Sequence, residues 1–419
     1  MPSASSVVGF HRTADDLACD GVPLADIAAA EGTPLYVYSA ATLRARYRAI
    51  DEAFGGYPHA IHYALKANST RAIAALLREL GSAADANSIW EIEVARKVGF
   101  ATGAIVFTGV GKTMAELECA VALGVKAINV ESAGELARVE AVATRAGRVS
   151  RVAIRVNPDI DAKSHPHIST GLKVNKFGVP LDEAAELFAS LPSRPALKLV
   201  AVHVHIGSQI TTLDPLRRAA ATVARLSEDL LRGGFGLEYV DVGGGLGVSY
   251  DERPVPSFTE YVTALVDAIK PTGLPIVVEP GRAIAASAGV LVARVVDIKP
   301  RTATSEFVVI DAGMTELLRP AMYGAYHRVE PVHRSHGGDR HYEIVGPVCE
   351  SSDVVARDRV LPELKVGDLV AIRDAGAYGS AMASNYNRRP LPAEALVDDG
   401  RWRVIRRRQT VDEMLSLES

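Results

Sequence analysis

Cysteine is scarce in this sequence: Cys19, Cys119 and Cys349 lie far apart in a chain of 419 residues. Such separated cysteines exclude a disulfide framework and a zinc site built from four thiolates. A dominant charge is also lacking, because 46 Lys and Arg residues stand against 50 Asp and Glu residues. The net charge of -4 offers no electrostatic footprint for nucleic acid or an anionic membrane, so we expect neither as a partner.

Long hydrophobic runs are absent as well. The longest apolar stretch, residues 283–293, is about half as long as a segment that spans a bilayer. The first residues, MPSASSVVGFHRTADD, lack the basic start and apolar core of a secretory signal peptide. With 48% hydrophobic and 23% charged residues, the composition is that of an ordinary globular protein. We therefore expect a cytoplasmic protein of two or three domains.

The sequence does contain short β-branched runs, separated by Ala-, Leu- and Arg-rich stretches with helical spacing. Eight strands alternating with helices over roughly 220 residues match a (β/α)8 TIM barrel, and a doubly wound parallel sheet is the competing arrangement. The runs are IHYALK (61–66), AADA (83–86), AIVFTG (104–109), AINVES (127–132), VAIRVN (152–157), LVAVHVHIGS (199–208), YVDVGGG (239–245) and PIVVEP (275–280).

The ends of these runs favour the barrel, because nearly every run ends in a residue capable of chemistry. In a barrel all strand ends converge on one mouth, where such enzymes keep their active sites, whereas the outer strands of an open sheet lie too far apart. The end residues are Lys66, Asp85, Thr108, Glu131, Arg155, Asn157, His205, Ser208, Gly243 to Gly245 and Glu279.

After Arg282 the strands follow one another with Gly, Pro and Asp turns and few helical patterns between them. This texture predicts a mainly antiparallel β domain, a sandwich or barrel-like sheet. Within it, residues 333–341 (HRSHGGDRH) are expected to form an exposed hairpin tip or loop. We expect residues 34–283 to form the barrel, and residues 1–33 and 284–419 to form the β domain.

Lys66 is the first residue that points to a specific chemistry. A lysine at the end of a buried strand in a barrel mouth loses hydration, and the lowered pKa that results suits Schiff-base formation. A lysine that extends to the rim, or forms a salt bridge with Asp85, is the structural alternative.

A glycine-rich loop, DVGGGLG (241–247), follows the seventh run. Its glycines allow backbone N–H groups to approach phosphate oxygens, and barrel phosphate sites favour the loops after strands seven and eight. The spacing is not that of a dinucleotide-binding fingerprint. Arg282 could hold a phosphate through its planar fork while Glu279 serves another atom, or the two side chains could simply pair.

Two histidines, His203 and His205, share one strand face. They could bind zinc with a carboxylate, but no third ligand stands at a diagnostic spacing, so we expect no metal. A barrel-mouth lysine, a phosphate cradle, a flat imidazole at His205 and the strand-end Glu279 are together what pyridoxal 5'-phosphate requires.

Motifs follow one another along nearly the whole chain: TPLYVYS (33–39), YALKAN (63–68), HPHISTGLKVNKFG (165–178), HVHIGSQI (203–210), DVGGGLG, VEPGR (278–282), LRPAMYGAYH (318–327), GPVCESSD (346–353) and DAGAYGSAMASNYN (374–387). In these motifs and their order the sequence resembles the diaminopimelate decarboxylases. They belong to the alanine-racemase-like, fold type III group of pyridoxal phosphate enzymes, which also contains eukaryotic-type ornithine decarboxylase.

The resemblance implies a role for most of the residues named above. Lys66 would form the Schiff base, His205 would stack on the cofactor ring, and Glu279 would face the pyridine nitrogen. The phosphate would be held by Ser208, Gly243, Gly244, Gly245 and Arg282, and the cofactor pocket would also include Asp85, Gly281 and Tyr378.

The resemblance also implies a homodimer with shared active sites, to which the β domain contributes. Cys349 and Glu350 would reach the partner's barrel mouth, and Cys349 or a water would donate the proton after decarboxylation. Lys66, Glu279 and Cys349 are therefore the expected catalytic residues. For Cys349, the alternative is a buried small hydrophobic residue.

Diaminopimelate carries a second amino-acid head, so its pocket needs a cation for the distal carboxylate and an anion for the distal ammonium. Arg319 and Tyr323 can bind that carboxylate and Glu350 that ammonium. Tyr378 and Arg282 complete the expected substrate contacts, and Arg282 would bind a substrate carboxylate as well as, or instead of, the phosphate.

We therefore expect pyridoxal phosphate-dependent decarboxylation of meso-2,6-diaminopimelate to L-lysine and CO2, the last step of lysine biosynthesis. A decarboxylase for ornithine, arginine or carboxynorspermidine stays open, although a distal carboxylate clamp would be wasted there. A racemase would need a two-base arrangement that the sequence does not reveal. A non-catalytic pyridoxal phosphate carrier would consist of a barrel alone.

Overall fold

The computed structural model describes residues 8–162, 170–172, 175–334 and 337–419, so part of the 165–178 motif lies outside the described residues. The chain divides into two compact units. A barrel unit consists of Arg46–Val248 and Pro254–Ala283, and a β unit consists of Met1–Ala45, Ser249–Arg253 and Ile284–Ser419. Residues 34–45, which we expected in the barrel, fall in the β unit because strand β4 (Leu35–Ser39) pairs with β14 and β20 there.

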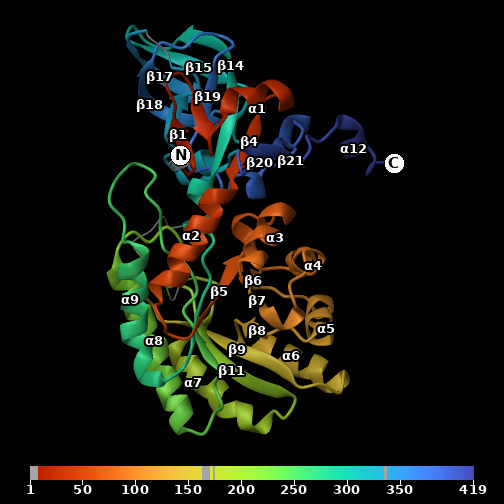
Figure 1. The fold of residues 1–419 in the computed structure, drawn as a ribbon. Helices are drawn as coiled ribbons and strands as arrows, with labels where there is room; N and C mark the ends of the chain where they lie inside the picture. The colour runs from red at the N-terminus through yellow and green to blue at the C-terminus, as the bar shows by residue number, and fades with distance from the viewer. Residues whose placement is uncertain (1–7, 163–169, 173–174, 335–336) are drawn as a thin grey trace. The chain divides into compact units, whose positions relative to one another are not determined.

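The described part of the barrel unit contains eight parallel strands in a closed ring, which confirms the predicted (β/α)8 barrel. Helices, coloured orange to green in Figure 1, surround the strands. The ring runs in the order β5 (His59–Ala64), β6 (Ala83–Ala86), β7 (Ile105–Phe107), β8 (Ala127–Val130), β9 (Ser150–Asn157), β11 (Leu197–Val204), β12 (Tyr239–Asp241) and β13 (Ile276–Val278), and β10 (Val179–Pro180) pairs with β9 outside it.

Several barrel helices begin with a Ser or Thr that is followed three residues later by Glu. The hydroxyl of this cap residue accepts the backbone N–H of that Glu, which fixes where the helix starts. All the helices around the barrel, with or without such a cap, are α2 (Ala40–Ala53), α3 (Arg71–Glu79), α4 (Ile89–Lys97), α5 (Met114–Leu123), α6 (Ala133–Arg145), α7 (Leu181–Ser190), α8 (Leu213–Arg232), α9 (Phe258–Ile269) and α10 (Arg282–Ala285). The cap is present in α4, α5, α6 and α9. No helix of the described chain is both long and apolar enough to cross a membrane.

The barrel interior changes from apolar to polar along the strands. One packed layer holds Val106, Ala127, Ala153, Ala201, Tyr239 and Val277. Two residues further along the same strands, and therefore on the same face, stand Thr108, Asn129, Arg155, His203, Asp241 and Glu279, all of them buried. The barrel mouth thus has a polar floor that is closed to solvent.

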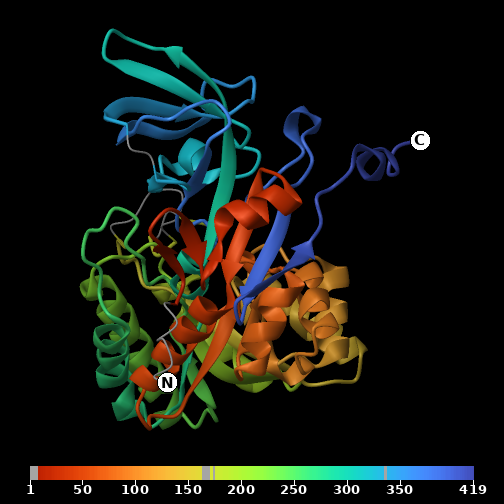
Figure 2. The same cartoon turned by 45° about the horizontal axis from the view of Figure 1, so that its top comes forward.

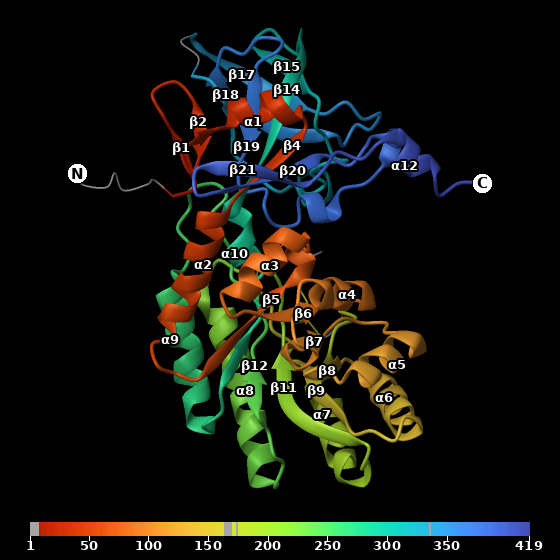
Figure 3. The same cartoon turned by 45° about the vertical axis from the view of Figure 1, so that its right-hand side comes forward.

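The β unit is built around β14 (Gly289–Pro300), a twelve-residue strand that pairs with β4, β15 and β19. Figure 2 shows β14 in teal beside β4 in red, and Figure 3 shows β4, β20 and β21 as neighbours. The remaining strands are β15 (Ser305–Ile310), β16 (Val329–Pro331), β17 (Asp339–Val345), β18 (Val354–Pro362), β19 (Leu369–Ile372), β20 (Ala393–Asp398) and β21 (Arg401–Arg406).

Most pairings in this sheet are antiparallel, as predicted, and β15–β17 and β4–β20 are parallel. An N-terminal antiparallel sheet of β1 (Phe10–Arg12), β2 (Leu17–Cys19) and β3 (Val22–Pro23) precedes α1 (Leu24–Glu31) and packs on the same core. The expected loop at 333–341 is wrong at its end, because β17 begins at Asp339 and pairs with β15 and β18; residues 335–336 lie outside the described chain.

Candidate active site

Lys66 lies in a 3-10 turn (Leu65–Ala67) directly after β5 rather than on the strand itself. Its Nζ is 3.5 Å from Oδ2 of Asp85 and 3.5 Å from Oδ1 of Asn87. The side chain of Asp85 is fully buried, whereas 30% of the Lys66 side chain is exposed. The salt bridge that we considered as the structural alternative is therefore present, and it leaves the Lys66 amine within reach of a small molecule.

Glu279 follows β13 and is buried on the floor of the barrel mouth. Its Oε2 lies 3.4 Å from Nε2 of His203, while Oε1 has no hydrogen-bond partner among the described residues. Burial raises the pKa of Glu279, but the charge and hydrogen bond of His203 and the charge of Lys66 outweigh burial and bring it below its usual range. An ionised carboxylate thus presents one open acceptor atom.

Asp241 stands beside His203 in the register of β11 and β12. Its Oδ1 accepts the N–H of Gly243 at 2.9 Å. Burial, and then the charge of Glu279, raise the pKa of Asp241 well above its usual value. Two buried carboxylates so close together cannot both be charged, and here Asp241 holds the proton.

His203, Asp241 and Glu279 also offer atoms that lie within 4.8 Å of one another, a grouping that would suit a metal ion. Asp241 is the third group that the sequence spacing did not reveal, because it comes from the neighbouring strand. The hydrogen bond between His203 and Glu279 accounts for their contact without an ion. The absence of a metal stays a prediction.

The glycine loop after β12 is tightly packed. A Cβ on Gly243 would lie 2.4 Å from the carbonyl oxygen of Val204, and one on Gly244 would lie 2.2 Å from that of Glu279. The N–H of Gly243 is used by Asp241, and that of Gly244 donates to Nδ1 of His205 at 3.1 Å. Of the three glycine N–H groups, that of Gly245 has no hydrogen-bond partner among the described residues, so it is the one most available for an anion.

The hydrogen bond from Gly244 sets the state of the His205 ring. Because Nδ1 accepts, the ring proton resides on Nε2. Burial lowers the pKa of His205 well below its usual value, and the charges of Lys66 and Arg155 lower it further. The ring is therefore neutral, and its backbone carbonyl is held by Arg155 (3.2 Å) and Thr170 (2.8 Å).

Ser208 and Arg282 come together from the loops after β11 and β13. The Ser208 Oγ accepts from Nε (3.2 Å) and Nη2 (3.0 Å) of Arg282, whose side chain is buried. A Cβ on the preceding Gly281 would lie 2.8 Å from Cβ of Ala67, next to Lys66. Gly281 thus permits the Arg282 turn to pack against the turn that carries the lysine.

Arg319, predicted as a substrate-binding cation, is buried within the β unit at the start of α11 (Arg319–Tyr323). Its Nη1 lies 2.7 Å from Nε2 of His327, and its guanidinium lies 4.6 Å from the ring centre of Tyr250. Tyr323 ends the same helix and is half-buried, and Tyr378 adopts a positive φ of 56°. Sequence reasoning missed His327, although it closes the LRPAMYGAYH motif.

Cys349 and Glu350 lie side by side on the surface of the β unit. The alternative of a buried hydrophobic Cys349 is wrong, because the thiol is exposed and lies 3.3 Å from Nδ2 of Asn387. Glu350 accepts a hydrogen bond from the hydroxyl of Tyr386 at 2.6 Å. Both side chains are therefore placed by the motif at residues 374–387.

Other predicted strand-end residues stabilise the barrel mouth. Arg155 forms a buried ion pair with Glu131 at 2.8 Å, and Glu131 also accepts the N–H groups of Gly109 (3.2 Å) and Gly178 (3.1 Å). Lys112, which no motif identified, forms a second buried pair with Glu135 at 2.7 Å.

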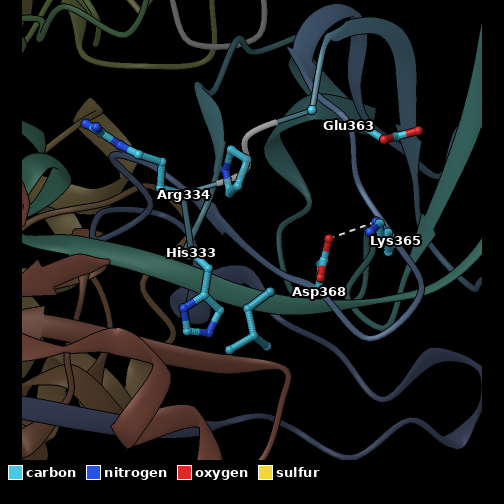
Figure 4. Close-up of a pocket in the computed structure, with 8 residues that line it drawn as sticks. His333, Arg334, Glu363, Lys365 and Asp368 are labelled. Carbon is cyan, nitrogen blue, oxygen red and sulfur yellow. Dashed lines mark hydrogen bonds between the residues drawn. The ribbon is translucent and has the colours of Figure 1, made fainter. Parts of the chain in front are cut away.

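Two surface cavities lie apart from these residues. One, of about 350 Å³ in the β unit, is lined by Pro331, His333, Arg334, Gly337, Glu363, Lys365, Asp368 and Leu369. Figure 4 shows Lys365 beside Asp368, joined by the hydrogen bond from the Lys365 N–H to the carboxylate (2.8 Å). Mixed charges and no predicted site residue make it a poor candidate. The other, of about 490 Å³ in the barrel unit, includes Pro192, Lys198 and Phe235 and contains none either.

Comparison with known proteins identifies the family of this chain. Residues 40–286 match the family model described as "Pyridoxal-dependent decarboxylase, pyridoxal binding domain". The chain is 45% identical over 399 residues to the diaminopimelate decarboxylase of Vibrio cholerae (95% of each chain) and 43% identical over 404 residues to that of Pseudomonas aeruginosa (96% of this chain, 97% of the relative).

A solved structure gives the same result. The diaminopimelate decarboxylase of Helicobacter pylori, complexed with L-lysine, superimposes with a TM-score of 0.91 at 43% identity, covering 94% of this chain and 98% of the other. The chain belongs to the diaminopimelate decarboxylase family of pyridoxal-dependent decarboxylases.

Proposed function

We propose that this chain binds pyridoxal 5'-phosphate and decarboxylates meso-2,6-diaminopimelate to L-lysine and CO2, the last step of lysine biosynthesis. The observation that carries the proposal is the ionised Glu279, buried in the barrel mouth with Oε1 open to a donor. A protonated pyridine nitrogen is such a donor. The 45% identity to a diaminopimelate decarboxylase supports the choice of substrate.

The barrel residues fit the cofactor as a set. Lys66 would hold it through Nζ, and the neutral His205 ring would lie against its pyridine ring. Ser208, Arg282 and the N–H of Gly245 would hold the phosphate, and Asp85 and Gly281 would complete the pocket in the barrel. Tyr378 of the β unit is a further expected cofactor contact. The fit is supported by the Ser208–Arg282 hydrogen bonds and by the glycine loop, where side chains would collide with backbone.

When bound, pyridoxal phosphate supplies an electron sink for the electron pair left by departing CO2. Glu279 keeps the pyridine nitrogen protonated, because its own pKa stays low beside His203 and Lys66. Cys349 is the candidate group that returns a proton to the substrate carbon, and an exposed thiol is accessible for that role.

The distal head of the substrate is recognised by charged groups of the β unit. Arg319 and Tyr323 bind its carboxylate, and Glu350 binds its ammonium. The contact with His327 orients the Arg319 guanidinium. Ornithine has no distal carboxylate, so it would lack the contacts that Arg319 and Tyr323 make with that group. Arg282 and Tyr378 are further substrate contacts.

The direct test is incubation of the purified protein and cofactor with meso-diaminopimelate, with measurement of CO2 and lysine. Ornithine and arginine serve as competing substrates in parallel reactions. We expect lysine from meso-diaminopimelate alone; turnover of ornithine without release of lysine would refute the proposal.

Lys66→Ala should abolish the visible absorbance of the lysine-bound cofactor, and Lys97→Ala, at an exposed lysine, should keep it. An absorbance band that persists in Lys66→Ala would assign the cofactor to another lysine.

We also propose a cytoplasmic homodimer in which Cys349 and Glu350 complete the partner's site. Mixing Lys66→Ala protein with Cys349→Ala protein then restores part of the activity, because one of the two mixed sites carries neither substitution. Inactive mixtures of subunits that demonstrably exchange would show that the sites are not shared.

A further inference from the structure

Asp353 occupies a buried position between two loops of the β unit. Its Oδ1 accepts the backbone N–H of Met314 at 2.6 Å, and its Oδ2 accepts that of Val348 at 2.7 Å. The residue is 4% exposed. A carboxylate with one backbone donor on each oxygen joins two chain segments that are 34 positions apart in sequence (348 − 314).

The backbone around Asp353 closes the second of these loops. The N–H of Asp353 donates to the carbonyl of Glu350, and the carbonyl of Asp353 accepts the N–H of Gly346, both at 3.0 Å. These hydrogen bonds therefore close the segment 346–353, which carries Cys349 and Glu350, into a loop. Asp353 is the last residue of this loop.

Two glycines leave room for the carboxylate. A Cβ on Gly313 would lie 2.6 Å from Oδ1 of Asp353, and a Cβ on Gly346 would lie 2.3 Å from Oδ2. Neither glycine has a positive φ, so close approach is the constraint here rather than backbone conformation.

The first loop leads directly to the other proposed substrate residues. Glu316 accepts the N–H of Gly313 (2.7 Å) and the hydroxyl of Thr315 (2.9 Å), which tightens the turn before α11 and Arg319. The segment before Arg319 and the segment that carries Glu350 therefore both contact the side chain of Asp353.

We propose that Asp353 is a positioning residue for substrate recognition, which holds the Cys349–Glu350 segment in place against the segment before Arg319. This rests on the proposed function, in which these groups bind the distal head of the substrate. Asp353 itself touches neither substrate nor cofactor, and it acts through the two backbone donors that it holds.

The test is Asp353→Asn, which keeps the size of the side chain. One amide oxygen still accepts an N–H, but the amide nitrogen faces the other donor, so one of the two ties is lost. We expect KM for meso-diaminopimelate to rise about tenfold, with a smaller fall in kcat and an unchanged cofactor absorbance. Asp358→Asn is the control, because Asp358 lies on β18, the strand that follows Asp353, with its side chain 91% exposed.

Hydrogen exchange provides a readout that does not depend on turnover. In Asp353→Asn, peptides covering 313–317 and 346–350 should exchange faster than in the wild type, and barrel peptides should not. Gly346→Ala, which displaces the carboxylate from the opposite side, should reproduce both effects if Asp353→Asn folds poorly.

An unchanged KM, or unchanged exchange in both segments, would overturn the proposal. Equal losses of kcat, cofactor binding and thermal stability would also overturn it, because they would show a general structural role. If the wild type releases no lysine, the proposed function fails on its own, and the exchange data still decide whether Asp353 ties the two segments.

Discussion

Removal of the Lys112 ammonium tests how the loop after β7 is held in the barrel. Its Nζ donates to the carbonyl oxygens of Gly109 (2.6 Å) and Asn129 (2.8 Å) and to Oε1 of Glu135 (2.7 Å). The two charged side chains are only 2% and 3% exposed. Lys112→Met keeps most of the aliphatic chain and removes all three hydrogen bonds.

The expected loss of unfolding free energy is about 3–5 kcal/mol, because a buried carboxylate is left without its cation. Burial raises the pKa of Glu135, and Lys112 opposes that rise, so the variant allows Glu135 to take up a proton. The loss should therefore be smaller at low pH than at pH 8. Lys112→Met/Glu135→Leu removes both charges and leaves two carbonyls without a donor, so it should lose only about 1–3 kcal/mol.

Urea and thermal unfolding, followed by circular dichroism, measure these differences. Lys97→Met is the matched control: its ammonium lies 3.8 Å from Glu93 on the surface, and the variant should change stability by less than about 0.5 kcal/mol. The reasoning is refuted if Lys112→Met behaves like Lys97→Met, or if the double variant is less stable than the single one.

Three further predictions concern Glu91, Gly244 and Asp241 of the barrel unit. Burial raises the pKa of Glu91 from 4.5 to about 7, so the stability that this carboxyl contributes is present below pH 4.5 and lost as the pH rises through 7. Melting temperatures of Glu91→Gln should match the wild type near pH 5 and exceed it near pH 8; a constant difference would contradict this. Gly244→Ala should lower the free energy of unfolding by about 2–4 kcal/mol and weaken cofactor binding, because the new Cβ would collide with the carbonyl of Glu279. Gly236→Ala is the control: its Cβ would meet no atom within 4 Å, so the melting temperature should not change. Asp241→Asn should lower the free energy of unfolding by less than about 1 kcal/mol, since a protonated carboxyl group resembles an amide. Asp241→Ala should lower it by about 2–4 kcal/mol. Equal losses for the two variants in denaturant titrations would show that the charge of Asp241 matters.

The barrel was predictable because its signals are local. Each of the eight runs has the pattern of a short strand, and stretches with helical spacing separate the runs. The polar residue at the end of a run marks the end of the strand. The same reasoning placed Lys66 at the end of the strand, whereas it lies in the 3-10 turn that follows the strand. No residue pattern distinguishes this turn, residues 65–67, from the end of a strand.

The β unit was less predictable, because its pairings join distant segments. The run at 33–39 reads as a buried strand, but nothing local shows that β4 pairs with β14 and β20 instead of preceding the barrel. β20 and β21 were missed, although Asp398 to Gly400 is a recognisable turn between two alternating patterns.

The residues of the candidate site were easier to predict than their hydrogen-bond partners and neighbours. Gly243 and Gly244 were chosen as N–H donors to phosphate, yet their N–H groups serve Asp241 and His205. Only the packed loop shows this, because the acceptors come from different positions in the chain. Likewise, no spacing rule links His203 to Asp241, which become neighbours through strand register.

Burial, rather than the number of acidic residues, sets the charge of the barrel floor. Asp85, Asp241 and Glu279 would together place three negative charges in a closed interior if all were ionised. Burial raises the pKa of Asp85 and Asp241, whereas His203 and Lys66 keep that of Glu279 low. Among these three carboxyl groups, Glu279 is therefore the one whose ionised form is most favoured, as a protonated ring nitrogen requires.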